Sequence, residues 1–137
     1  MRLLIDANIV LDVLQKREPH FRDSSLIWKL CETNLDEGFV SALSFADLVY
    51  IMRKELDPDQ IKDLLYKMKR IFRIADFSVA DLEKAADYRW PDFEDAVQSA
   101  TAERLRADCI ITRNVRDFSG SRIAAFTPSE YLARYYS

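Results

Sequence analysis

The segment Leu3-Leu4-Ile5-Asp6 carries the clearest information about the fold class of this chain. Three consecutive apolar residues show no polar alternation, and such a short run is typical of a strand buried on both faces of a parallel sheet. Cys109-Ile110-Ile111, followed by Thr112, repeats the pattern near the other end of the chain. Two doubly buried strands so far apart in the sequence predict a central parallel sheet.

Segments with helical spacing alternate with further strand candidates around these two runs. We predict helices over residues 9–15, 21–34, 45–52, 58–70, 79–88 and 93–106 and from Pro128 onward. We predict the other strands over residues 38–42, 71–75 and 123–126. The expected helix-start signals are caps at Asn8, Ser44 and Asp92, Pro58 in a first turn, and a capping box of Ser78 with Asp81. The alternation predicts an α/β fold with helices on both faces of the sheet.

Length, charge and cysteine content narrow the function classes. A chain of 137 residues suits one domain, which we expect to span residues 1–137. The net charge of −3 argues against binding nucleic acid through bulk positive charge, but not against a nuclease with an acidic active site. With one histidine and two separated cysteines, Cys31 and Cys109, no zinc site of the usual ligand set can form, and we expect two reduced, buried thiols. The N-terminal apolar run is too short for a signal peptide or a membrane helix, so we expect a cytoplasmic protein without membrane association.

Four aspartates fall where a parallel sheet forms its binding sites, beyond the carboxyl ends of its strands. Asp6 and Asp117 follow the two buried strands, whereas Asp47 and Asp95 lie in the first turns of predicted helices. Converging carboxylates repel one another and raise each other's pKa values unless a cation is present. Mg²⁺ prefers oxygen ligands and can activate water against a phosphodiester. This pattern indicates a metal-assisted hydrolase.

Each of these aspartates also has a structural explanation. Asp6 can cap the helix that follows it, and Asp117 lies in a turn, where aspartate is common. The helix dipole favours Asp47 and Asp95 in a first helical turn whatever their function. The functional interpretation therefore depends on the four side chains lying together, which the sequence does not show.

Four segments resemble, in order, the motifs of the PIN-domain family. They are Asp6-Ala7-Asn8, Ser41-Ala42-Leu43-Ser44-Phe45-Ala46-Asp47, Asp92-Phe93-Glu94-Asp95-Ala96 and Thr112-Arg113-Asn114-Val115-Arg116-Asp117-Phe118. The resemblance extends from Arg2 to about Pro128. It implies a three-layer α/β/α fold with a central parallel sheet. It also implies an endoribonuclease that depends on Mg²⁺ or Mn²⁺, commonly the toxin of a type II toxin–antitoxin pair of the VapC type.

The motif positions imply roles for individual residues. Asp6, Asp95 and Asp117 would be metal ligands, and Asp47 would complete the catalytic set at the second acidic position. The supporting residues would be Asn8, Asp92, Thr112 and Asn114, and the residues that hold substrate phosphate would be Arg113 and Arg116. The family usually has Glu at the position of Asp47. Because the side chain of Asp is shorter by one methylene, Asp92 and Glu94 are candidates to compensate for the shorter reach of Asp47.

Other interpretations differ in single residues. A haloacid-dehalogenase-like phosphatase would carry Asp at the position of Asn8, and a receiver domain would need paired acids after its first strand and a strand-end Lys-Pro, which are lacking. A catalytically weak or inactive PIN fold that only binds RNA or protein stays open because of Asp47. The resemblance further implies an RNA substrate, a homodimer and an antitoxin partner.

Overall fold

A five-stranded parallel sheet forms the centre of the computed structural model, which describes residues 1–136 of the chain. Its strands, in the order β3-β2-β1-β4-β5, are β1 (Arg2–Ile5), β2 (Glu37–Ser41), β3 (Arg73–Ala75), β4 (Cys109–Ile111) and β5 (Ala124–Phe126). The helices are α1 (Ala7–Leu14), α2 (Phe21–Glu32), α3 (Ala42–Ile51), α4 (Pro58–Ile71), α5 (Val79–Tyr88), α6 (Phe93–Arg104) and α7 (Pro128–Tyr136), with a 3₁₀ turn η1 (Val115–Phe118).

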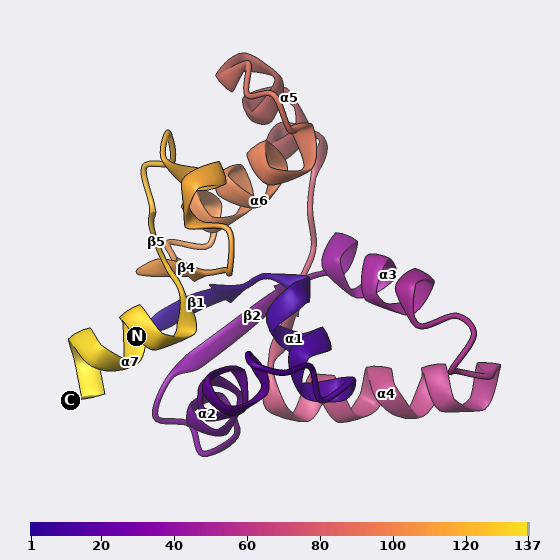
Figure 1. The fold of residues 1–137 in the computed structure, drawn as a ribbon. Coiled ribbons are helices and arrows are strands. Elements are labelled where there is room, and N and C mark those ends of the chain that lie inside the picture. The colour runs from indigo at the N-terminus through magenta and orange to yellow at the C-terminus, as the bar shows by residue number, and fades with distance from the viewer. Residues whose placement is uncertain (137) are drawn as a thin grey trace.

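The sheet divides the apolar core into two layers. Leu3 and Ile5 of β1 pack with α1, α2, α3 and α4 on one face, whereas Leu4 packs with α6 and η1 on the other. In Figure 1, α5 and α6 lie above the sheet and α2, α4 and α7 lie below it. The predicted three-layer α/β/α arrangement is therefore confirmed.

The two apolar runs form the middle of this sheet, as predicted. β1 pairs in parallel with β2 on one side and β4 on the other, with Leu4 opposite Ile110 in the register of β1 and β4. Leu3 and Leu4 have no exposed surface, and Ile110 has 1%. Burial on both faces explains why these strands lack polar alternation.

Two predicted caps lie a few residues too late in the sequence. The cap of α1 is Asp6 rather than Asn8, and the cap of α3 is Ser41, whose Oγ accepts a 3.0 Å hydrogen bond from the backbone N–H of Ser44. In both cases the last strand residue is followed almost at once by helical backbone, so the cap is the final extended residue. The capping box of Ser78 with Asp81 and the cap at Asp92 are confirmed.

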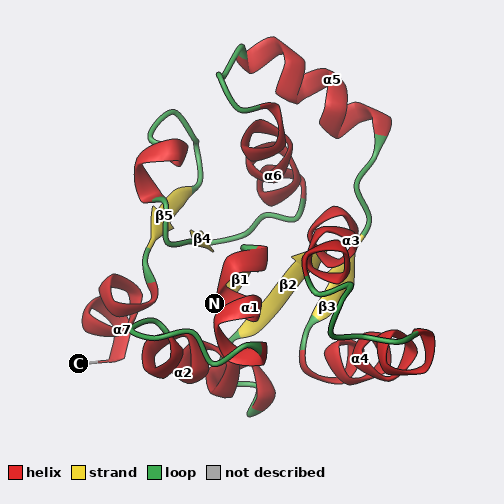
Figure 2. Cartoon of the chain, turned by 45° about the vertical axis from the view of Figure 1, so that its right-hand side comes forward, coloured by secondary structure: helices red, strands yellow, loops and turns green. Residues whose placement is uncertain are grey.

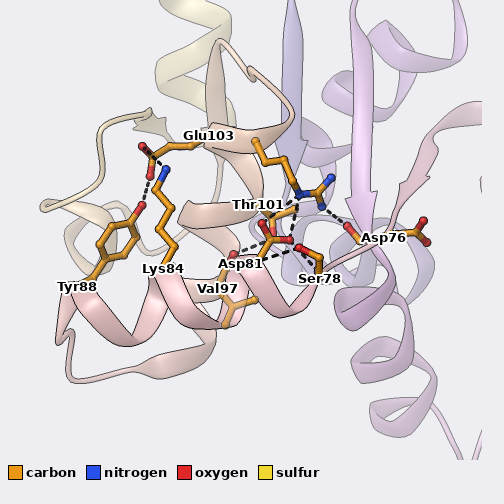
Figure 3. A network of polar contacts seen from close by, with 9 residues as sticks. Asp76, Ser78, Asp81, Lys84, Tyr88, Val97, Thr101 and Glu103 are labelled. Carbon is orange, nitrogen blue, oxygen red and sulfur yellow. Dashed lines mark hydrogen bonds and ion pairs between the residues drawn. The ribbon is translucent and has the colours of Figure 1, made fainter.

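Polar contacts hold α5 against α6 (Figure 3). The Tyr88 hydroxyl donates to Glu103, and Lys84 Nζ lies 3.3 Å from another oxygen of the same carboxylate. Arg104 donates from Nε to Asp81 at 3.0 Å. These contacts position α6, the helix that carries Asp95 at its beginning.

Cys31 and Cys109 are free and buried, as predicted. Burial, together with the charge of nearby Asp36, raises the pKa of both thiols to about 12, so neither is a nucleophile at neutral pH. Within residues 1–136, no helix combines the length and apolar character that crossing a membrane requires.

Candidate active site

An acidic cleft of about 410 Å³ opens beyond the carboxyl ends of the strands. Its walls come from both sides of the sheet, α1 and α3 from one and α6 from the other (Figure 2). The polar residues that line it are Asp6, Asn8, Asp47, Tyr50, Asp92, Glu94, Asp95, Asn114 and Asp117. The four aspartates singled out in the sequence therefore line one cleft.

Asp6 lies at the beginning of α1 and lines the cleft. It stands at the cap position, but its Oδ2 accepts a 2.8 Å hydrogen bond from Thr112 Oγ1 and no capping hydrogen bond. Burial raises the pKa of Asp6 above its ordinary value, and the hydrogen bond from Thr112 offsets part of this rise. The Oγ1 of buried Thr112 also accepts from the backbone N–H of Asn114 at 3.1 Å. Thr112 thus joins the end of β1 to the loop after β4.

Asp95 enters the cleft from the first turn of α6. Its backbone N–H donates to Asp92 Oδ1 at 3.0 Å, which fixes the beginning of the helix. Burial, together with the charges of Asp92, Asp117 and Asp6, raises the pKa of the Asp95 carboxyl to about 6. The carboxylate form of Asp95 is therefore disfavoured in the cleft.

Glu94 lies opposite Asp47 across the cleft. A hydrogen bond with Asp47, burial, and the charges of Asp47, Asp92 and Asp95 together raise the pKa of Glu94 to about 7. Glu94 and Asp47 line the same cleft, and compensation by Glu94 for the shorter side chain of Asp47 stays a prediction.

The two arginines expected to hold phosphate are placed differently. Arg116 lines a second pocket that adjoins the acidic cleft, beside Asp117. Arg113 lines neither, and its Nε lies 3.5 Å from Oδ2 of buried Asp12. A basic residue that the sequence did not single out, Arg17, donates to Asn8 Oδ1 at 3.5 Å at the edge of the cleft. No local motif marks Arg17, which follows the end of α1.

The donor set of the cleft consists of hard oxygen ligands. Carboxylate and amide oxygens suit Mg²⁺ or Mn²⁺, and the raised pKa values of Asp6 and Asp95 reflect a site that would gain from a cation. Among residues 1–136, no three His, Cys, Asp or Glu side chains are arranged closely enough to hold a metal ion together. The shared metal site of Asp6, Asp95 and Asp117 therefore stays a prediction.

The sequence matches the family model described as PIN domain over residues 2–116. In fold the chain is similar to one from a toxin–antitoxin complex of Klebsiella pneumoniae, with 24% identity, a TM-score of 0.71, and coverage of 92% of this chain and 97% of that one. VapBC2 from Rickettsia felis bound to a DNA fragment from their promoter gives 17% identity, a TM-score of 0.66, and coverage of 93% and 98%. VapBC-1 from nontypeable Haemophilus influenzae gives 14% identity, a TM-score of 0.68, and coverage of 94% of this chain and 99% of that one. No curated protein matches the chain.

Proposed function

The chain belongs to the PIN-domain family, and from this we propose that it is a metal-dependent endoribonuclease acting as the toxin of a type II toxin–antitoxin pair. The observation that carries the proposal is the convergence of Asp6, Asp47, Asp95 and Asp117 on one cleft. These residues are distributed over the chain, and only the fold brings their side chains to one cleft. Residues 1–137 would form a single PIN domain in the cytoplasm.

Asp6, Asp95 and Asp117 would hold Mg²⁺ or Mn²⁺ in this cleft. Mg²⁺ in proteins is usually bound by one or two carboxylates and keeps several waters, which suits carboxylates that line a cleft without closing on one point. The bound ion would neutralise the carboxylates, polarise a phosphoryl oxygen and lower the pKa of a water.

The residues of the chain would prepare the site for RNA. Thr112 holds the Asp6 carboxylate through Oγ1, and Asn114 is tied to the same hydroxyl through its backbone. The raised pKa of Glu94, about 7, favours its neutral form, which lowers the local negative charge that an RNA phosphate would meet. Arg116 lies where it can hold a phosphate at the edge of the cleft.

We propose an antitoxin protein and a second copy of the chain as partners. The structural neighbours include chains from toxin–antitoxin complexes, and their similarity covers more than nine-tenths of this chain. Tyr50 and Ile51 of α3 are 65% and 47% exposed at the cleft, and they offer apolar surface for a protein partner.

A nuclease assay on structured and unstructured RNA tests the proposal. We expect cleavage by the wild-type chain with Mg²⁺ or Mn²⁺, no cleavage in EDTA, and at least a hundredfold loss in Asp95→Asn. Asp63→Asn, which removes an exposed carboxylate from α4, should cleave like the wild type. Cleavage that survives both EDTA and Asp95→Asn would contradict a metal nuclease.

The alternative is a PIN fold that binds RNA or protein without cutting. Asp47, shorter than the usual Glu, is the observation that favours it. RNA binding in a gel-shift assay without cleavage in any divalent ion would support this alternative. Restored cleavage in Asp47→Glu would then identify the shorter side chain as the cause.

A further inference from the structure

A second pocket, of about 340 Å³, lies between the beginning of α6 and η1. We call it the indole pocket after Trp90, which forms one of its walls. It shares Asp92, Asp95 and Asp117 with the acidic cleft, so the two hollows adjoin along these carboxylates. A ligand that enters the acidic cleft can therefore extend into the indole pocket.

The Trp90 side chain is held rigidly. Its ring stacks on Tyr88 at a centroid distance of 5.4 Å and an interplanar angle of 29°. It also meets Phe118, which is 4% exposed, edge to face at 6.2 Å. Contacts on two sides fix the orientation of the indole, so its half-buried surface toward the pocket is a preformed aromatic wall.

Gly120 keeps this wall accessible. A Cβ atom at this position would lie 3.2 Å from Trp90 Nε1 and 3.4 Å from Cε2 and Cζ2. The backbone of Gly120 is not in the left-handed region, so its conformation alone does not require glycine. The missing side chain leaves space beside the indole, within the pocket.

Two hydrogen-bond donors of the pocket are unused within residues 1–136. Arg116 forms no ion pair there, although Asp92, Asp95 and Asp117 line the same pocket. The indole N–H of Trp90 also has no acceptor in the described part of the chain. An aromatic wall with a free guanidinium beside it suits a ligand that is both planar and anionic.

We propose that the indole pocket binds one unpaired ribonucleotide next to the phosphate that is cut. Its base would pack on Trp90 and its phosphate would meet Arg116, while the neighbouring phosphodiester enters the acidic cleft. This inference rests on the proposed nuclease function and adds to it a subsite for one base beside the phosphate that is cut. An unpaired base would occupy this subsite most readily, because flipping a paired base out of its stack costs unpairing and unstacking energy. Stacking on an aromatic side chain contributes about tenfold to the affinity for each base.

Binding is tested without cleavage by following the two indole N–H signals of ¹⁵N-labelled protein in EDTA. The probes are adenosine, guanosine, cytidine and uridine, which are uncharged and are not substrates. We expect at least one nucleoside to shift the Trp90 signal saturably, while the signal of Trp28, buried against Phe72, stays in place. Trp28→Phe assigns the two signals.

Gly120→Ala is the matched variant because its methyl group fills the space beside Trp90. The variant should fold, as its melting curve will check, and should bind the nucleoside at least fivefold more weakly. No saturable shift of Trp90, an equal shift of Trp28, or unchanged binding by Gly120→Ala would overturn the proposal.

A kinetic arm separates this inference from the proposed function. If RNA is cleaved, Gly120→Ala and Arg116→Gln should each raise KM about fivefold with kcat within twofold, whereas Arg22→Gln on α2 should change neither. Cleavage with unchanged KM in both variants would contradict nucleotide binding in the indole pocket but would not contradict the proposed nuclease function. Nucleoside binding by a chain that cleaves no RNA would overturn the nuclease and leave the pocket as a nucleotide site.

Discussion

Arg113 Nε lies 3.5 Å from Asp12 Oδ2, and Asp12 is completely buried. Ser24 Oγ donates to the same carboxylate oxygen at 3.0 Å, whereas Oδ1 of Asp12 has no partner within residues 1–136. The ion pair connects α1 to the loop that carries Thr112, Asn114 and Asp117. It therefore helps to position the loop whose residues Asn114 and Asp117 line the acidic cleft.

Arg113→Met is expected to lower the free energy of unfolding by about 3 kcal/mol, because it leaves a buried carboxylate without its counter-charge. Urea denaturation measures the loss. Arg116→Met, at an exposed arginine without an ion pair in the described chain, should stay within about 0.5 kcal/mol of the wild type. The double variant Asp12→Leu/Arg113→Met should recover part of the lost free energy of unfolding. If Arg113→Met were as stable as the wild type, the ion pair would contribute little to stability.

Gly38→Ala is expected to destabilise the protein by about 1–3 kcal/mol through overpacking. A Cβ at Gly38 would lie 2.6 Å from Cys31 Sγ and 2.8 Å from Phe72 Cδ1, and both side chains are buried. Thermal and urea unfolding measure the effect. Removing the sulfur in Gly38→Ala/Cys31→Ala should relieve part of the strain, and a double variant no more stable than Gly38→Ala would argue against this steric cause.

The stability of the protein should fall in acid through Asp81. Burial alone would raise the pKa of Asp81, but hydrogen bonds from Arg104 and Ser78 outweigh it and hold the pKa below its ordinary value of 3.8. Because the folded pKa is lower than the unfolded one, the stabilisation is complete well above pH 4 and is lost as pH falls through the folded pKa.

Arg104→Met tests this linkage, since it removes the main contact that lowers the pKa of Asp81. We expect the variant to be less stable at pH 7 and to lose less further stability than the wild type between pH 5 and pH 2, as measured by urea unfolding across this range. If the free energy of unfolding fell by the same amount with pH in both proteins, Asp81 would not contribute to the loss of stability in acid.

Asp95→Asn should raise the stability of the metal-free protein while it removes activity. Asp95 faces the charges of Asp92, Asp117 and Asp6, so a neutral amide relieves repulsion, and a gain of about 0.5–2 kcal/mol is typical of such changes. Melting curves in EDTA measure the gain. Added Mn²⁺ should stabilise the wild type more than Asp95→Asn, with Asp63→Asn behaving like the wild type. A less stable metal-free variant would contradict burial and repulsion as the effects that disfavour the charged form of Asp95.

Local sequence patterns were sufficient to predict the central strands of the sheet and the beginnings of two helices. Leu3-Leu4-Ile5 and Cys109-Ile110-Ile111 were recognisable as central strands because burial on both faces excludes polar residues from such a run. The capping box at Ser78 and the cap at Asp92 could be predicted for a similar reason, since a cap acts within three residues. The cap at Ser41 was missed, and Asp6 was only an alternative to Asn8 as the cap of α1, because the end of each strand, rather than cap propensity, sets where these helices begin.

The arrangement of the site depended on packing between distant parts of the chain. The motifs selected aspartates that line one cleft, but they did not indicate that Arg113 turns toward Asp12, that Asp47 raises the pKa of Glu94, or that Trp90 borders a pocket. A side chain's direction and its partners follow from which helix packs on which face of the sheet, and those contacts join residues up to about a hundred positions apart. Apolar patterning is a local property that one segment displays alone, whereas electrostatic pairing requires the folded chain to bring both partners together.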